Sequence, residues 1–172
     1  IYLVYHSPAA FQPGDAEMDL VAATLGDGLT SRLYQALVYE NPLASEVTAY
    51  QESMLLGSLF SIEATAKPGV ELDRLEQAID EVLTAYRQSG PTPQELERHK
   101  AGIEYGTINR LQSVTAKADA LNQYQFFFGE PNSFRRDLDR YRRATAEDVK
   151  GWAQKVFTPD ARGLVFVTER FS

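Results

Sequence analysis

Apolar and polar residues alternate most regularly over residues 58–66 of this chain. Four apolar residues fall on one side of an extended backbone: Phe60, Ile62, Ala64 and Ala66. Mostly polar residues occupy the positions between them, and a period of two predicts a β-strand with one buried face and one wetter face. β-branched and aromatic residues favour further strands at residues 1–6, 46–52 and 164–168.

A helical period dominates between the turns at Pro68-Gly69 and Gly90-Pro91. Apolar residues there recur every three or four positions: Leu72, Leu75, Ile79, Val82, Leu83 and Tyr86. This spacing gives a helix one apolar face for packing. Weaker stripes predict further helices that begin near residues 15, 31, 92, 114, 134 and 145.

Two of these helix starts carry capping residues. Thr92 with Glu95 has the spacing of a capping box, and Pro93 suits the first helical position between them. Thr145 with Asp148 caps the last helix in a similar way. These caps fix the boundaries of the two predicted helices better than their apolar stripes do.

The predicted order is a strand, two helices, two strands, several helices and a final strand. This order predicts an α+β fold, in which helices pack on one face of a mostly antiparallel four-stranded sheet. The 172 residues suit one domain with a sizeable core, and are somewhat few for two. We therefore expect residues 1–172 to form a single domain.

Composition and charge narrow the range of functions. A hydrophobic fraction of 44% with 11% aromatic residues is enough for a packed core. The net charge of −7 repels phosphate backbones, so we expect no nucleic-acid binding. The absence of cysteine excludes disulfides, thiolate zinc sites and cysteine nucleophiles.

No apolar run is long enough to predict a membrane span. No signal peptide is visible, and the chain begins at Ile1 without an initiator methionine. We therefore expect the chain to be a piece of a longer polypeptide.

Short basic clusters interrupt the acidic sequence between residues 135 and 143. Two interpretations compete for these arginines: contact with nucleic acid or an acidic partner, or the solvated face of a helix. We favour the solvated face, because Asp137 and Asp139 alternate with the arginines.

Candidate catalytic residues are few. His6 and His99 are far apart in sequence, and a hydrolytic zinc helix needs two histidines one turn apart. A site assembled by folding from both histidines and Glu95 is conceivable, but a strand-end His6 and an exposed helix His99 are the simpler interpretation. Ser7 and Ser31 lack the flanking pattern of a nucleophile elbow.

A glycine turn, Gly26-Asp27-Gly28, resembles the start of a phosphate-binding loop. It lacks the lysine of such a loop and the third glycine of a dinucleotide fingerprint, so we interpret it as a turn. Thr30 or Ser31 then caps the following helix.

The most distinctive stretch is residues 25–50, which reads SRLY at 31–34, LVYENPLAS at 37–45 and EVTAY at 46–50. Without a gap, this stretch resembles the C-terminal half of zinc peptidases of the pitrilysin/insulinase family, which includes mitochondrial processing peptidase subunits. There the pattern runs from a glycine turn through S-R-L and L-R-E-K-x-G-L-A-Y to S-V-x-A-Y. The similarity continues in GSLF at 57–60, in the turn at 68–69 and in TPQEL at 92–96.

The resemblance implies one half of a clam-shaped particle. In this family zinc and the inverted H-x-x-E-H motif lie in a homologous N-terminal half, and the C-terminal half closes the chamber over an extended peptide. The resemblance therefore implies no metal ligand and no catalytic residue in this chain, with zinc in a partner N-terminal domain. The implied partners are a zinc-bearing homologous domain or subunit and a peptide substrate.

Many active members of the family supply an arginine and a tyrosine from the C-terminal half to the substrate and transition state. In the gapless match these positions are Val38 and Ser45. Valine has no charge or donor, and serine is too short to replace a tyrosine hydroxyl. A partner subunit could supply the pair, the chain could be a pseudo-peptidase kept for assembly, or Arg32 or Tyr39 could substitute; we favour the partner subunit.

Taken with the resemblance, the sequence predicts the non-catalytic half of a zinc metalloendopeptidase of the processing-peptidase type, inactive alone. It would form the chamber wall and peptide-binding surface opposite a zinc-bearing domain. The alternative is a structural or assembly subunit of a multisubunit complex with no proteolytic role.

Overall fold

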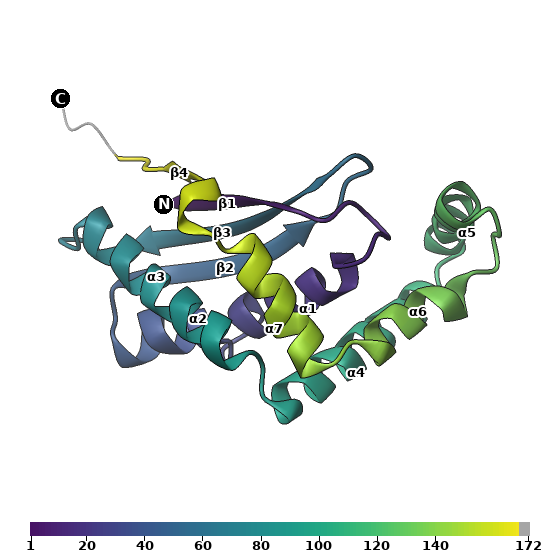
Figure 1. Ribbon diagram of the computed structural model, residues 1–172, viewed down its shortest axis with the longest axis horizontal. Helices are drawn as coiled ribbons and strands as arrows, with labels where there is room; N and C mark the ends of the chain where they lie inside the picture. Colours follow the sequence, from purple (N-terminus) through teal and green to yellow (C-terminus); the bar gives the residue numbers. More distant parts are fainter. Residues whose placement is uncertain (169–172) are drawn as a thin grey trace.

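A four-stranded antiparallel sheet forms one layer of the protein in a computed structural model that describes residues 1–168 (Figure 1). The strand order is β2-β3-β1-β4, so β2 and β4 are the edges. The strands are β1 (Tyr2–Ser7), β2 (Ala44–Glu52), β3 (Ser58–Ala66) and β4 (Arg162–Val165). The mostly antiparallel α+β fold expected from the sequence is confirmed, and each strand pair is antiparallel.

Helices form the second layer. They are α1 (Asp15–Gly26), α2 (Arg32–Tyr34), the π-helix η1 (Gln35–Glu40), α3 (Leu72–Ser89), α4 (Pro93–Arg110), α5 (Val114–Phe128), α6 (Phe134–Arg143), α7 (Ala146–Val156) and the 3₁₀ turn η2 (Pro159–Ala161). Helices α1, α3 and α7 lie together on one side of the sheet (Figure 1). Helices α5 and α6, with the C-terminal part of α4, extend to one end of the molecule (Figure 1).

The core lies between the sheet and the helices α1, α3 and α7. The alternation of β3 is reproduced, since Phe60 and Ile62 are completely buried. Phe157, just after α7, contacts Tyr5 and Phe60 edge to face, with ring centroids 5.1 and 5.0 Å apart. Each such aromatic pair contributes about 0.5–1.5 kcal/mol beyond its burial, so this cluster anchors the last helix to the sheet.

Within residues 1–168, no helix covers the other face of the sheet (Figure 1). Its exposed side chains include Tyr2 and His6 of β1 and Thr48, Tyr50 and Glu52 of β2. We call this the open face. A sheet that is buried on one side and solvated on the other is the ordinary outcome of alternating antiparallel strands.

Several boundaries differ from the sequence-based expectation. Strand β2 begins at Ala44 rather than at residue 46, because a register shift between Ala44 and Glu46 lets pairing resume with Ala66. Strand β4 starts at Arg162 and ends at Val165, short of the expected residues 164–168. Its position is set by pairing with β1, where Tyr5 lies opposite Arg162.

Candidate functional site

The turn after α1 brings residues 25–50 against the sheet. A side chain at Gly26 would overlap the backbone of Ala49 in β2, so the close approach of α1 to this strand requires glycine. Gly28 has φ 76°, a left-handed conformation that glycine adopts without strain. The two glycines therefore serve packing and turn geometry, as the turn interpretation predicted.

Ser31 is the N-cap of α2, but its hydroxyl makes no capping hydrogen bond. The residue is completely buried, and its Oγ finds no partner among the described residues. The prediction that Ser31 or Thr30 would cap by its side chain is therefore wrong. The chain reaches the cap position, but the hydroxyl is turned into the protein rather than toward the helix N–H groups.

Arg32 links α2 to the start of α4 through hydrogen bonds. Its Nε and Nη2 donate to the two carboxylate oxygens of Glu95 at 3.1 and 2.8 Å, and Nη2 also donates to the carbonyl of Gly90 at 2.8 Å. The guanidinium lies 5.0 Å from the ring centroid of Tyr86. Arg32 is committed to this structural role, which argues against its replacing the missing family arginine.

The surroundings of Glu95 favour its ionised form. Partial burial of Glu95 opposes ionisation, but hydrogen bonds from Arg32 and Thr92 outweigh it and lower the pKa of Glu95 to about 2. The expected capping box is present, with Glu95 N–H donating to Thr92 Oγ1 and Thr92 N–H donating to Glu95 Oε2. Glu95 thus holds α2 and the start of α4 together through these hydrogen bonds.

Val38 lies in the π-helix η1, between α2 and β2. It is partly buried and packs against the hydrophobic core, whereas its neighbour Tyr39 is 75% exposed. Single π-helical turns often occur at functional sites. Val38 has no polar atom to offer a ligand beyond its backbone.

Ser45 follows at the irregular start of β2, on an edge of the sheet. It is exposed, and its Oγ donates to the carbonyl oxygen of Thr65 at 3.2 Å. Leu43 N–H donates to the carbonyl of Leu37 at 2.9 Å, so the end of η1 and the start of β2 are tied together. Val38 and Ser45 therefore flank one compact turn.

The open face carries side chains in rows across the strands. Thr48, Glu63 and Tyr2 occupy one row, and Glu52, Leu59 and His6 occupy another. The Tyr50 hydroxyl donates to Glu63, and this hydrogen bond raises the pKa of Tyr50. The face thus offers carboxylates, hydroxyls and aromatic rings, and it adjoins the free edge of β2.

No group of three histidine, aspartate or glutamate side chains within residues 1–168 converges as a metal site. His6 is exposed on the open face, and His99 is buried on α4 beside Arg98. The expectation of an exposed His99 is wrong, because α4 turns this residue toward the protein. Burial and the nearby Arg98 charge lower the pKa of His99.

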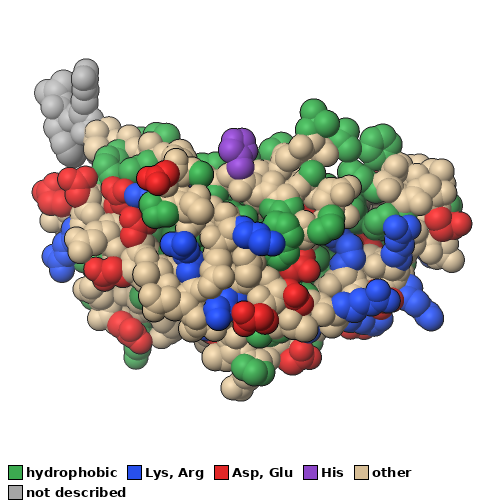
Figure 2. Space-filling model, in the orientation of Figure 1, with side chains coloured by type: hydrophobic (Ala, Val, Ile, Leu, Met, Phe, Trp, Pro, Cys, Tyr) green, Lys and Arg blue, Asp and Glu red, His purple; other side chains and the backbone are tan. Residues whose placement is uncertain are grey.

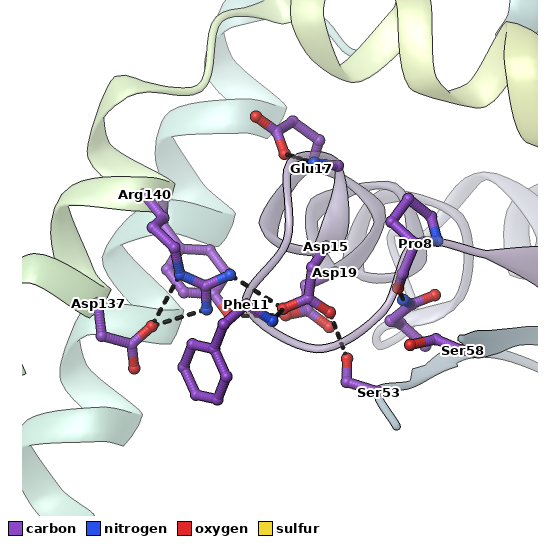
Figure 3. A network of polar contacts seen from close by, with 12 residues as sticks. Pro8, Phe11, Asp15, Glu17, Asp19, Ser53, Ser58, Asp137 and Arg140 are labelled. Atoms are coloured by element: carbon purple, nitrogen blue, oxygen red, sulfur yellow. Dashed lines mark hydrogen bonds and ion pairs between the residues drawn. The ribbon is translucent and has the colours of Figure 1, made fainter. Parts of the chain in front are cut away.

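A second polar cluster joins α1 to α6, and sequence reasoning missed it (Figure 3). Arg140 donates to Asp15 at 2.9 Å and to Asp137 at 2.7 and 3.0 Å. The hydroxyl of Tyr141 donates to Asp19 at 2.6 Å. Burial raises the pKa of Asp19 to about 6, against the opposing effect of the Tyr141 hydrogen bond.

Asp15 is the centre of this second cluster. It is 3% exposed, and besides Arg140 it accepts from the Phe11 backbone N–H at 2.8 Å and the Ser53 hydroxyl at 2.6 Å. Its contacts thus join the loop before α1, the end of β2 and α6. Its polar partners among residues 1–168 all belong to the protein itself, so the cluster ties these elements together.

Comparison with known proteins places these features in a family. Residues 1–103 match the family model described as "Peptidase M16 inactive domain". A curated relative, an uncharacterised zinc protease of Streptomyces coelicolor, is 27% identical over 139 residues. That match covers 81% of this chain and 30% of the relative, so the matched part is less than a third of that protein's length.

Solved structures of similar proteins have the same fold as this chain. The inactive peptidase domain of a protein named as a zinc protease in Bordetella parapertussis superposes with a TM-score of 0.83 at 28% identity, covering 94% of this chain and 87% of that one. A protease from Helicobacter pylori has the same fold, with a TM-score of 0.83 at 21% identity, over 94% of this chain and 38% of that one. The resemblance stated from residues 25–50 is confirmed.

Proposed function

Because this chain belongs to the peptidase M16 family as an inactive domain, we propose that it forms the non-catalytic half of a zinc metalloendopeptidase. In this proposal residues 1–172 act as one C-terminal-type half-domain. The open face lines the chamber and contacts an extended peptide. A homologous zinc-bearing domain, in the same polypeptide or in another subunit, supplies the metal and performs hydrolysis.

The observation that carries the proposal is the open face beside the free edge of β2. An extended peptide presents alternating side chains and a row of backbone donors and acceptors. An edge strand can pair with that backbone, while exposed side chains such as Tyr50 and Thr48 contact the peptide's side chains.

No group of three or more His, Cys, Asp or Glu side chains converges as a metal site within residues 1–168, and in this proposal hydrolysis takes place on the zinc-bearing domain. The chain's own contribution is to bind and orient the peptide and to keep water from part of the chamber. Exclusion of water strengthens electrostatic interactions at a reacting centre.

Val38 and Ser45 are proposed as the vacated positions of the family's arginine and tyrosine. Both flank the turn from η1 into β2, where Ser45 is exposed and Val38 is partly buried against the core. Restoring the pair with Val38→Arg and Ser45→Tyr in the assembled enzyme should increase peptide turnover. Unchanged turnover would count against a vacated substrate site.

A reconstitution experiment tests the main proposal. The 172-residue chain alone should bind no stoichiometric zinc by elemental analysis and should not hydrolyse a quenched fluorescent peptide. Adding the zinc-bearing domain encoded with it should produce hydrolysis that neither component shows alone. Full activity of the zinc-bearing domain without this chain would overturn the proposed role.

The second candidate function is an assembly subunit without a proteolytic role. The replacement of both working positions by Val38 and Ser45 favours it. It is distinguished by the surrounding sequences: a full-length polypeptide and encoded neighbours that all lack a zinc-binding H-x-x-E-H motif would replace the peptidase proposal with this one.

A further inference from the structure

A groove of about 800 Å³ lies at the end of the molecule that carries α5 and α6. Its walls are the loop before α1, the end of α5 and one face of α6. None of its lining residues belongs to the sheet. The groove is therefore a separate surface from the open face, and a ligand bound there would not touch the positions of Val38 or Ser45.

Aromatic rings form the floor of the groove. Phe11 and Phe128 both line it, and their ring centroids are 4.9 Å apart. Phe11 has φ 60°, which a bulky residue rarely adopts, and the hydrogen bond from its N–H to Asp15 holds it there. Such backbone strain persists where the surroundings enforce it and is concentrated at binding sites.

One guanidinium group lies against each of these two rings. Arg136 lies 4.4 Å from the ring centroid of Phe128, and Arg140 lies 4.6 Å from that of Phe11. The groove-lining positions of α6 recur every three or four residues, so they form one face of the helix: Arg135, Arg136, Asp139, Arg140 and Arg143. Figure 2 shows basic side chains gathered over this end of the molecule.

The arginines of the groove differ in whether they form ion pairs. Arg140 is neutralised by Asp15 and Asp137. Within residues 1–168 neither Arg135 nor Arg136 forms an ion pair, and Arg143 reaches Asp139 only at 3.8 Å while 84% of its side chain is exposed. The solvated-face interpretation thus holds for part of α6 but leaves arginines available at the groove.

The acidic residues of the groove are largely occupied by the protein itself. Glu17 accepts from the Gly14 N–H at 3.1 Å, and Glu130 accepts from the Asn132 N–H at 3.1 Å. Asp139 lies within ion-pair distance of Arg142 at 3.4 Å as well as of Arg143. Arg135 and Arg136 therefore present positive charge at a groove that also contains these carboxylates, on a chain whose net charge is −7.

We propose that this groove binds an acidic segment of a partner polypeptide, with carboxylates on Arg135 and Arg136 and an apolar side chain on the Phe11–Phe128 floor. Arginine recognises carboxylates in a planar, two-pronged geometry. The aromatic floor favours a side chain over a bare phosphate, and the acidic remainder of the chain disfavours a long polyanion such as nucleic acid. The proposal does not rest on the peptidase role.

Fluorescence anisotropy tests this directly with the 172-residue chain. The probe is a short fluorescein-labelled peptide that alternates glutamate with leucine and phenylalanine. A peptide with lysine in place of each glutamate serves as its control. The acidic peptide should bind, and its affinity should fall as salt is added, because screening weakens exposed charge pairs. The lysine peptide should bind at least about tenfold more weakly.

Variants locate the site. The double variant Arg135→Gln, Arg136→Gln should weaken binding of the acidic peptide by about tenfold or more, since two carboxylate contacts are lost. The control is Arg74→Gln, an exposed arginine on α3 outside the groove, which should change the affinity less than about twofold. Circular dichroism should show that each variant remains folded, because the replaced side chains are exposed.

Several outcomes would overturn the proposal. These are equal binding of both peptides, equal weakening by the α3 and α6 variants, and no binding of the acidic peptide at low salt. Tighter binding of a labelled single-stranded oligonucleotide than of the acidic peptide, abolished by the α6 variant, would assign the groove to nucleic acid instead. Hydrolytic activity in the reconstituted enzyme is a separate readout, so the two proposals can fail independently.

Discussion

Two arginine-centred clusters hold helices of this domain together, and they differ in charge balance. Between α2 and α4, Arg32 meets a single carboxylate, Glu95, through two hydrogen bonds. Between α1 and α6, Arg140 pairs with Asp15 and Asp137, and Asp19 lies close by with a hydrogen bond from Tyr141 (Figure 3). The first cluster is electrically balanced and the second has an excess of acid.

The two clusters respond to pH in opposite directions. The pKa of Glu95 is lowered to about 2, so its charge is stabilising. The pKa of Asp19 is raised to about 6, chiefly because it is buried, with the charge of Asp15 adding to the effect. Similar residue types at helix seams therefore stabilise by ionisation in one place and by protonation in the other.

The largest expected effect comes from removing the central arginine of the acidic cluster. Arg140→Met leaves Asp15 and Asp137 without their cation in a partly buried site, and it keeps much of the packing against Phe11. Breaking such a pair costs roughly 3 kcal/mol of unfolding free energy, measured by urea denaturation at pH 7. Arg143→Met is the control, because its side chain is 84% exposed, and it should change stability by less than about 0.5 kcal/mol.

A substitution in the balanced cluster should cause a smaller loss of unfolding free energy. Glu95→Gln keeps the size of the side chain but removes its charge, and should cost about 1–2 kcal/mol at pH 7. A lowered folded pKa gives stability that is present above the ordinary value of 4.5 and lost as the pH falls toward 2. The cost of the substitution should therefore shrink between pH 5 and pH 2.5 in urea denaturation.

The matched control for this pH dependence is Glu97→Gln on the same helix, whose side chain is 73% exposed. It should show little change at either pH. If Glu95→Gln cost as much at pH 2.5 as at pH 7, the contribution of Glu95 would come from packing rather than from its charge.

Removing the excess acid should stabilise the protein. Asp19→Asn keeps an oxygen to accept from Tyr141 but carries no charge. A raised folded pKa means that stability is full below the ordinary value of 3.8 and is lost as the pH rises through about 6. The variant should therefore gain about 1 kcal/mol over the wild type at pH 8 and nothing at pH 3.5, measured by thermal or urea unfolding.

The groups facing Asp19 are Asp15, Asp137, Arg140 and Tyr141. Asp119→Asn, an exposed position on α5, controls for the general change in net charge. A gain that is the same at pH 3.5 and pH 8, or equal in the two variants, would show that Asp19 is not the proton-binding group.

The contrast also shows how far sequence reasoning reaches. Alternation over residues 58–66 and the capping boxes of α4 and α7 are local, and each appears in the structure. The pair Asp15–Arg140 joins residues 125 positions apart, and nothing local marks it. The same arginines that resemble a solvated helix face divide, on folding, into a structural residue and groove residues.

The residues of the candidate site also could not be identified from local sequence patterns. Val38 and Ser45 came from a family pattern rather than from their own chemistry, because neither side chain signals a function. The burial of His99 likewise depends on how α4 packs, since the apolar stripe of that helix is weak. Periodicity predicts which elements form, whereas the partners of polar side chains depend on how those elements are assembled.

The smallest expected effect concerns Ser31, which precedes Arg32 in the balanced cluster. Its Oγ is buried without a partner among the described residues, and an unpaired buried hydroxyl is unfavourable. Ser31→Ala should therefore leave stability unchanged or raise it by a few tenths of a kcal/mol. Thr92→Ala is the matched control, since that hydroxyl does cap α4, and it should cost about 1 kcal/mol. Equal losses in the two variants would mean that Ser31 also caps its helix in solution, as its sequence position first indicated.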